Sequence, residues 1–273
     1  MPGEQAPPSN AEPPSPATRP SRLRTSVVIP ARFRGPRDSA NGGYVAARVA
    51  SYVGVTSVDA TAPHGVEPRP VTAVLRSPVS LDVPLELAVD GDRVTLHEGG
   101  ALVAEAEPGE LDTDPLEPVT YADALAAGER FAGVSDHPMP TCFGCGTERA
   151  PGDGLRLAIG AVSGDLVATA WVPDRSLLPP GAQEGPIAPE FVWSVLDCTA
   201  AWAWDFGAEP ALLGTMTGVV DEAPYVGDHC AAVATVTGRD GRKIRTATCL
   251  YDADGRVLGR AQSVWITVDR SRL

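Results

Sequence analysis

The chain has 273 residues and a formal net charge of −13. That length is enough for two ordinary domains, each with a hydrophobic core of its own. The acidic balance argues against a general nucleic-acid binder, which would carry a basic face, and no apolar run reaches the roughly eighteen residues that a membrane helix needs.

The first 22 residues are rich in Pro, Ser, Glu and Ala. They lack the apolar core of a signal peptide, and their composition predicts a disordered tail. We therefore expect a cytoplasmic protein without a membrane partner.

A first helix-and-sheet unit is predicted over residues 23–107. Its helix follows the segment Ser39-Ala-Asn41-Gly42-Gly43-Tyr44, in which Ser39 or Asn41 can cap the helix by accepting a free amide hydrogen bond. The helix extends to about residue 53. Strands are predicted before and after it, with glycine-containing turns at 90–92 and 99–100, over residues 24–33, 70–76, 84–89, 93–98 and 101–107.

A second unit of the same kind is predicted over residues 140–270, after a linker at 108–139 that contains an Ala-rich helix at 121–131. Its long helix runs from about 189 to 206 and begins with Pro189, a residue favoured in the first helical turn. Alternating patterns and strong turn signals predict strands at 155–159, 165–172, 211–220, 229–237, 243–251 and 257–268. The pattern predicts an α+β protein in which each unit packs a long helix against an antiparallel sheet.

The chain has five cysteines, an odd number that indicates reduced thiols when no export signal is present. Cys142 and Cys145 form a single C-x-x-C turn. A closed structural zinc site needs four ligands, usually from a second such pair, so we expect buried thiols here and no metal site.

Two basic clusters stand out in the acidic chain, one formed by Arg32, Arg34 and Arg37 and the other by Arg239, Arg242, Lys243 and Arg245. Each is explained by solvated loop or strand-edge charges. Arg242 and Lys243 become candidate ligands for an anionic substrate if a binding site lies between the clusters.

Three segments of the sequence are similar to the double-hotdog acyl-CoA thioesterase superfamily, and especially to its phenylacetate-type members. They are Asn41-Gly-Gly-Tyr44 with the downstream segment 76–84, the turn 142–146 with Gly152-Asp-Gly154, and Val192-Trp193-Ser-Val-Leu-Asp197-Cys198 with the closing segment 251–266. The resemblance covers residues 24–107 and 140–268. It implies two hotdog modules fused in one chain, each a curled antiparallel sheet around a long helix.

The resemblance also implies a site for thioester hydrolysis. In phenylacetate-type enzymes an acid follows the second glycine of the helix start by seven residues; here that count relates Glu190 to Asp197, and Gly43 to Ala50. The first unit thus keeps the glycines and the second keeps the acid. We expect one composite site in which Asp197 activates water and the helix start at Asn41, Gly42 and Gly43 polarises the carbonyl.

Other residues could contribute to this site. Thr215 could orient a water, while Glu190, Trp193 and Tyr44 could contact the substrate together with Arg242 and Lys243. Each also has a plain structural explanation: strand threonines are common, an acid is favoured in the first helical turn, and large aromatic side chains usually fill cores.

The leading functional prediction is hydrolysis of an acyl thioester carried by coenzyme A or a carrier protein, without a separate cofactor because coenzyme A is part of the substrate. Two alternatives stay open. One is an enoyl-thioester hydratase or dehydratase, although no His lies in the predicted helices. The other is a protein that binds an acyl thioester or a lipid-like ligand without turning it over. No nucleic-acid partner is expected, and fused modules could still assemble into a homo-oligomer.

Overall fold

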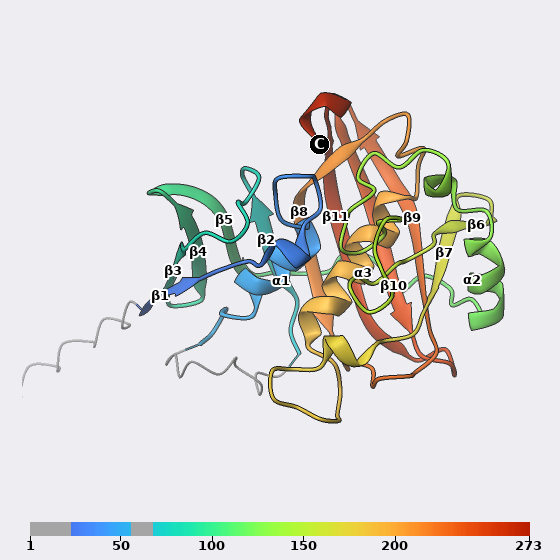
Figure 1. The fold of residues 1–273 in the computed structure, drawn as a ribbon, viewed down its shortest axis with the longest axis horizontal. Helices are drawn as coiled ribbons and strands as arrows, with labels where there is room; N and C mark the ends of the chain where they lie inside the picture. The colour runs from blue at the N-terminus through green and yellow to red at the C-terminus, as the bar shows by residue number, and fades with distance from the viewer. Residues whose placement is uncertain (1–22, 56–67) are drawn as a thin grey trace, which may run out of the picture.

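The computed structural model describes residues 23–55 and 68–273. The tail predicted at residues 1–22 lies outside this part of the chain. Within it, eleven strands form one antiparallel sheet (Figure 1). They are β1 (Leu23–Val27), β2 (Val71–Leu75), β3 (Leu85–Asp90), β4 (Arg93–Glu98), β5 (Ala101–Pro108), β6 (Gly160–Ser163), β7 (Leu166–Trp171), β8 (Ala211–Val220), β9 (Cys230–Asp240), β10 (Lys243–Tyr251) and β11 (Val257–Thr267).

The order of the strands shows how the two halves of the chain combine. Strands β1 to β5 occupy one side of the sheet in the order β1-β3-β4-β5-β2, and the later strands continue it as β8-β11-β10-β9-β7-β6. The halves join where β2 pairs with β8, with Val71 opposite Gly218 and Val74 opposite Thr215. Strand pairing therefore runs without interruption across the boundary between the two predicted units.

Two helices lie side by side on one face of this sheet, α1 (Gly42–Ala50) and α3 (Pro189–Ala201) (Figure 1). Helix α1 packs on β2 and β5, and α3 packs mainly on β9 and β10. The two helices run antiparallel, because the start of α1 at Gly43 meets Asp197 while Arg48, near its end, forms an ion pair with Glu190 near the start of α3.

Helix α3 is the centre of the core. All its residues from Phe191 to Ala201 are buried, and small side chains on the strands beneath it, including Ala232 and Ala234, allow close approach. Its buried hydroxyls are satisfied within the helix, since Thr199 donates to the Val195 carbonyl oxygen at 2.7 Å. Asp197 is the one acidic side chain buried in α3, so it needs a different explanation.

The segment predicted as a linker packs on the opposite face of the sheet. Helix α2 (Tyr121–Gly128) contacts β6, β7 and β9, and its Ala124 joins a second small core with Val233 and Tyr251. The Tyr251 hydroxyl donates to the carbonyl oxygen of Leu116, in the extended part of the linker. This segment thus covers sheet surface that would otherwise face water.

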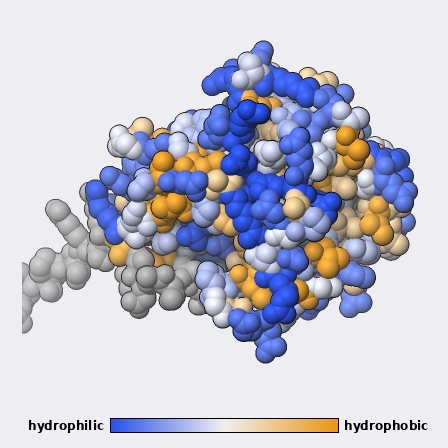
Figure 2. Space-filling view, in the orientation of Figure 1, coloured by the Kyte–Doolittle hydropathy of each residue, from blue (hydrophilic) through white to orange (hydrophobic). Residues whose placement is uncertain are grey.

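The surface seen in Figure 2 mixes residue types. Hydrophilic residues run through the middle of this face, and hydrophobic ones gather in smaller groups on either side. Among the described residues, no helix combines the length and apolar character needed to cross a membrane.

Most predicted elements are present, but several boundaries were wrong. The strand predicted at 155–159 does not form, because the amides of Leu155 and Leu157 bond instead to the carbonyl oxygens of Phe143 and Gly144. The opening strand ends at Val27, ahead of Pro30 and a short 3-10 turn. The three helices end earlier than predicted, at Ala50, Gly128 and Ala201.

Candidate functional site

Asp197 and Asn41 meet between the two helices. Asn41 caps α1 by accepting the amide of Tyr44 at 2.9 Å, and its side-chain nitrogen donates to Asp197 Oδ2 at 3.0 Å. Both residues are almost fully enclosed, since Asn41 exposes 3% of its surface and Asp197 exposes 4%. The cap of one helix therefore also fixes the carboxylate of the other.

The approach of the helices depends on Gly43. A Cβ atom at this position would lie 2.5 Å from Asp197 Cβ and 2.7 Å from the Trp193 carbonyl oxygen, distances at which atoms overlap. Gly42 is similarly confined, since a Cβ there would lie 2.9 Å from Leu213 Cβ. Both glycines thus have a packing reason besides any role in binding a carbonyl.

Burial changes the acidity of Asp197. Desolvation is the largest effect and raises the pKa of this carboxyl to about 7, while the nearby amide of Gly43 and the side chain of Asn41 act to lower the pKa. Its second oxygen, Oδ1, has no hydrogen-bond partner among the residues that the structure describes. A carboxyl with a pKa near 7 and one free oxygen can accept a proton at neutral pH.

A cavity of about 250 Å³ opens beside Asp197, lined by residues of both halves of the chain and mostly apolar. The lining includes Asn41, Gly42 and Asp197, apolar side chains such as Val45, Leu213 and Phe206, and three arginines, Arg76, Arg242 and Arg272. Arg76 forms an ion pair with Glu105, so Arg242 and Arg272 are the side chains that offer positive charge to an anionic group in a chain that is acidic overall.

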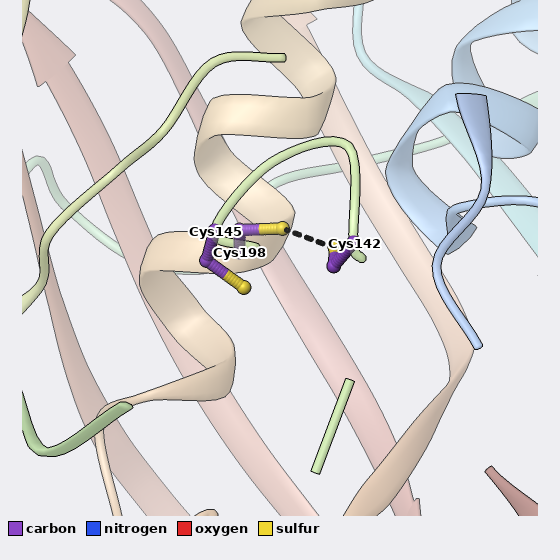
Figure 3. Close-up of side chains that lie close together, drawn as sticks. All are labelled: Cys142, Cys145 and Cys198. Carbon is purple, nitrogen blue, oxygen red and sulfur yellow. Dashed lines mark hydrogen bonds between the residues drawn. The ribbon is translucent and has the colours of Figure 1, made fainter. Parts of the chain in front are cut away.

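Three cysteines form part of the same wall (Figure 3). Cys142 and Cys145 come from the 142–146 turn, and Cys198 comes from α3. The Cys142 and Cys198 sulfurs are 3.7 Å apart, and Asn41 Nδ2 lies 3.6 Å from Cys198 Sγ. Hydrogen bonds from the thiols of Cys145 and Cys198, with the amides of Cys145 and Gly144, lower the pKa of Cys142 well below its usual value.

The opposite end of the helix pair has a different chemistry. Glu190 bonds Arg48 Nη1 at 2.9 Å, and neither residue lines the cavity. Ala50, the counterpart of Asp197 in α1, offers no polar group. The acid expected to contact substrate here is neutralised by an arginine of the other helix.

The remaining candidates divide between cavity and core. Arg242 lines the cavity, whereas its neighbour Lys243 is exposed and does not. Tyr44 is buried and stacks on Phe33 with ring centroids 4.1 Å apart, and Trp193 is buried against Gly218. Neither aromatic residue lines the cavity, and neither does Thr215 on β8.

Several cavity residues carried no predicted role. Cys142 and Cys145 stood out as a motif, whereas Cys198, in a predicted helix, was not expected to join them. Arg76 lies in a segment of the resemblance, and Arg272 near the C-terminus had no signal at all. In the first basic cluster, Arg32 is used structurally, since it donates to the carbonyl oxygens of Gly152 and Asp153 at 3.1 and 3.0 Å.

Comparison with solved structures identifies the fold. The chain is similar to the tesB protein of Mycobacterium avium subspecies paratuberculosis, with a TM-score of 0.59 and 13% identity over 90% of this chain and 93% of that one. It is equally similar to a hotdog-fold protein of Alicyclobacillus acidocaldarius, with a TM-score of 0.59 and 13% identity over 93% and 95% of the two chains. An acyl-CoA thioesterase II, TesB2, of Mycobacterium marinum gives a TM-score of 0.51 at 9% identity over 86% and 93%.

Sequence comparisons add nothing to this result. No protein-family model matches the chain, and no curated protein matches it either. The structural similarity confirms the hotdog fold that the sequence motifs predicted, with a large antiparallel sheet and few helices.

Proposed function

We propose that this protein hydrolyses an acyl thioester at the cavity beside Asp197. The observation that carries the proposal is the state of this carboxyl: it is buried, its pKa is raised to about 7, and one oxygen is free. Burying an acid in an apolar helix is unfavourable unless it is compensated. Perturbed acids in clefts are enriched at catalytic sites, and the proteins of similar fold include one named as an acyl-CoA thioesterase.

In the proposed reaction, ionised Asp197 takes a proton from a water molecule as that water attacks the thioester carbonyl carbon. The carbon–sulfur bond then breaks, and the sulfur leaves as a thiol after taking back from Asp197 the proton that came from the water. Asn41 holds the carboxylate in position through its 3.0 Å hydrogen bond. Gly42, the first residue of α1, has an amide without an intrahelical partner, which can polarise the carbonyl oxygen.

The cavity suits an acyl group better than a whole acyl-CoA. Its volume of about 250 Å³ is below the roughly 300–1,000 Å³ of sites that enclose a drug-sized ligand. The carrier part of the substrate would therefore stay outside, where Arg242 and Arg272 can attract its phosphates. These charges suit coenzyme A and the phosphopantetheine arm of a carrier protein alike.

We also infer that the two halves of the chain are two hotdog modules. Each half supplies one long helix and a set of antiparallel strands, and the modules would join through β2 and β8. On this reading the candidate site is composite, with Asn41 and Gly42 from one module and Asp197 from the other.

Binding without turnover is the second candidate function, and one observation favours it. Asn41 and the Gly43 amide face Asp197 in the arrangement of an ordinary inter-helix contact, which a purely structural acid would also show. A hydratase is less well supported, since none of the described residues that line the cavity is a histidine.

Thiol release from a panel of acyl-CoAs, together with calorimetric binding of non-hydrolysable thioether analogues of the same chain lengths, separates the two functions. We expect release of free coenzyme A for at least one chain length. Tight binding of the analogues with no release from any acyl-CoA would overturn hydrolysis and support the binding protein.

A further inference from the structure

The cluster of Cys142, Cys145 and Cys198 has no part in the proposed hydrolysis. Its three ligand atoms lie within 4.8 Å of one another, and all three residues are buried at the cavity wall (Figure 3). The two remaining cysteines, Cys230 and Cys249, lie on strands β9 and β10 and do not belong to the group. The chain thus concentrates its thiols at one point, contributed by two separate elements.

The spacing of the sulfurs fits a tetrahedral metal ion. Zinc–sulfur bonds of about 2.3 Å in a tetrahedral site place neighbouring sulfurs roughly 3.8 Å apart. Cys142 Sγ and Cys198 Sγ already stand 3.7 Å apart. Small side-chain rotations would then bring the third sulfur into place, because it is already within 4.8 Å of both.

The turn that carries two of the thiols is shaped for this cluster. A Cβ atom on Gly144 would overlap the Cys198 sulfur, and one on Gly146 would lie 2.6 Å from the Cys142 amide nitrogen. Glycine at both positions lets the turn close around α3. The amides of Leu155 and Leu157 hold the turn by donating to its carbonyl oxygens at 2.8 and 2.9 Å.

Backbone and side-chain donors surround the cluster. The amides of Gly144 and Cys145 are directed at the Cys142 sulfur. Asn41 Nδ2 adds a further donor, 3.6 Å from Cys198 Sγ and 3.9 Å from Cys142 Sγ. Nearby His137 is already engaged, since one ring nitrogen lies 3.0 Å from the Cys145 carbonyl oxygen and the other accepts the Met139 amide.

We propose that Cys142, Cys145 and Cys198 bind one zinc ion that joins the 142–146 turn to α3, with the fourth ligand position open to the cavity. An incomplete protein ligand set with an open position is typical of reactive zinc sites, whereas closed structural sites use four protein ligands. The expectation of metal-free thiols set Cys198 aside because it falls in a predicted helix; the docking of α3 brings its sulfur to the C-x-x-C pair. The site stands independently of the proposed hydrolysis.

The test measures metal directly. The full chain, purified under reducing conditions with added zinc and then dialysed, is analysed for bound metal by mass spectrometry, and the chelated protein is titrated with Co²⁺. We expect one zinc per chain and a thiolate-to-cobalt charge-transfer band. Cys142→Ser, Cys145→Ser and Cys198→Ser should lose both signals, while Cys230→Ser and Cys249→Ser, which also replace buried cysteines, should keep them.

Thermal unfolding guards against variants that simply fail to fold. Zinc should raise the Tm of the wild type and of the two control variants, and should leave the Tm of the three cluster variants unchanged. A metal-free wild type, or equal zinc in cluster and control variants, would overturn the proposal. So would a wild type that binds no zinc and forms a Cys142–Cys198 disulfide in air, because the cluster would then be a redox pair.

Discussion

Asn41 and Asp197, 156 positions apart in the sequence, are joined by a 3.0 Å hydrogen bond between the start of one helix and the middle of another. The bond leaves Asp197 Oδ1 without a hydrogen-bond partner in the described part of the chain. Hydrogen bonds to both oxygens would stabilise the ionised form of a carboxylate. Asp197 has a hydrogen bond to one oxygen, which holds it in place, and its pKa is raised. This combination of fixed position and incomplete solvation suits Asp197 to the role of a base in the proposed hydrolysis.

The raised pKa of Asp197 predicts a pH-dependent stability. Its folded pKa of about 7 exceeds the ordinary value of 3.8, so the folded state binds the extra proton between these values. The stabilisation that this proton gives the folded state is fully present below about pH 4 and is lost as pH rises through about 7. The gap between the two pKa values corresponds to a change on the order of 4 kcal/mol in the free energy of unfolding. Denaturant unfolding of wild type and Asp197→Asn from pH 4 to pH 8 measures it.

The Asn variant is the control for that experiment, because it cannot titrate. As pH rises, the wild type should steadily lose unfolding free energy relative to the variant. A difference that stays constant over this range would show that Asp197 keeps an ordinary pKa.

Gly43→Ala should destabilise the protein by about 1–3 kcal/mol, the range for overpacking a core. The added methyl would lie 2.5 Å from Asp197 Cβ and push the helices apart. Gly238→Ala is a matched control, since a Cβ there meets nothing within 4 Å. Urea unfolding compares the two; equal stability of both variants would mean that the helices do not approach as closely as described.

Glu190→Gln should lower stability by roughly 1 kcal/mol, the scale of a single ion pair near the surface. The substitution removes the charge that faces Arg48 at 2.9 Å and leaves the cavity untouched. Thermal melts in low and high salt measure it, since added salt should shrink the difference between wild type and variant. A gain in stability would indicate that the ion pair does not form in solution.

Arg242→Ala should raise the KM for an acyl-CoA and leave kcat nearly unchanged, as expected when an interaction with the carrier part of the substrate is lost. Lys243→Ala is the control, because Lys243 is next in the sequence but its side chain does not line the cavity. Steady-state kinetics on both variants decides the matter. Equal effects of the two substitutions would point to general electrostatic attraction rather than a contact at the cavity.

The local pattern of the sequence predicted much of the fold. Capping at Asn41, the proline at the start of α3 and the turn signals between strands all act over a few residues, so their consequences can be recognised without a structure. The strand expected at 155–159 failed because its amides pair with the 142–146 turn. That pairing depends on how the preceding cysteine turn folds back onto this segment.

The candidate site divides in the same way. Counting seven residues showed that one helix keeps the glycines and the other keeps the acid, and pairing of the two units was expected to bring Gly43 and Asp197 into one site. The structure has them in contact; their chemical roles stay a prediction. Glu190 was wrongly expected near substrate, because its Arg48 partner lies on the other helix. Cys198 escaped notice for the same physical reason: only the packing of α3 against the cysteine turn brings the third sulfur to the pair.

The most direct test of the central claim compares two variants at opposite ends of the helix pair. Thiol release from the best acyl-CoA substrate is measured for Asp197→Asn and Glu190→Gln at matched, verified folding. We predict a fall of about 10²–10⁴-fold for Asp197→Asn, the usual contribution of a general base, and wild-type turnover for Glu190→Gln. Wild-type turnover by Asp197→Asn would contradict the assignment of this carboxyl as the base.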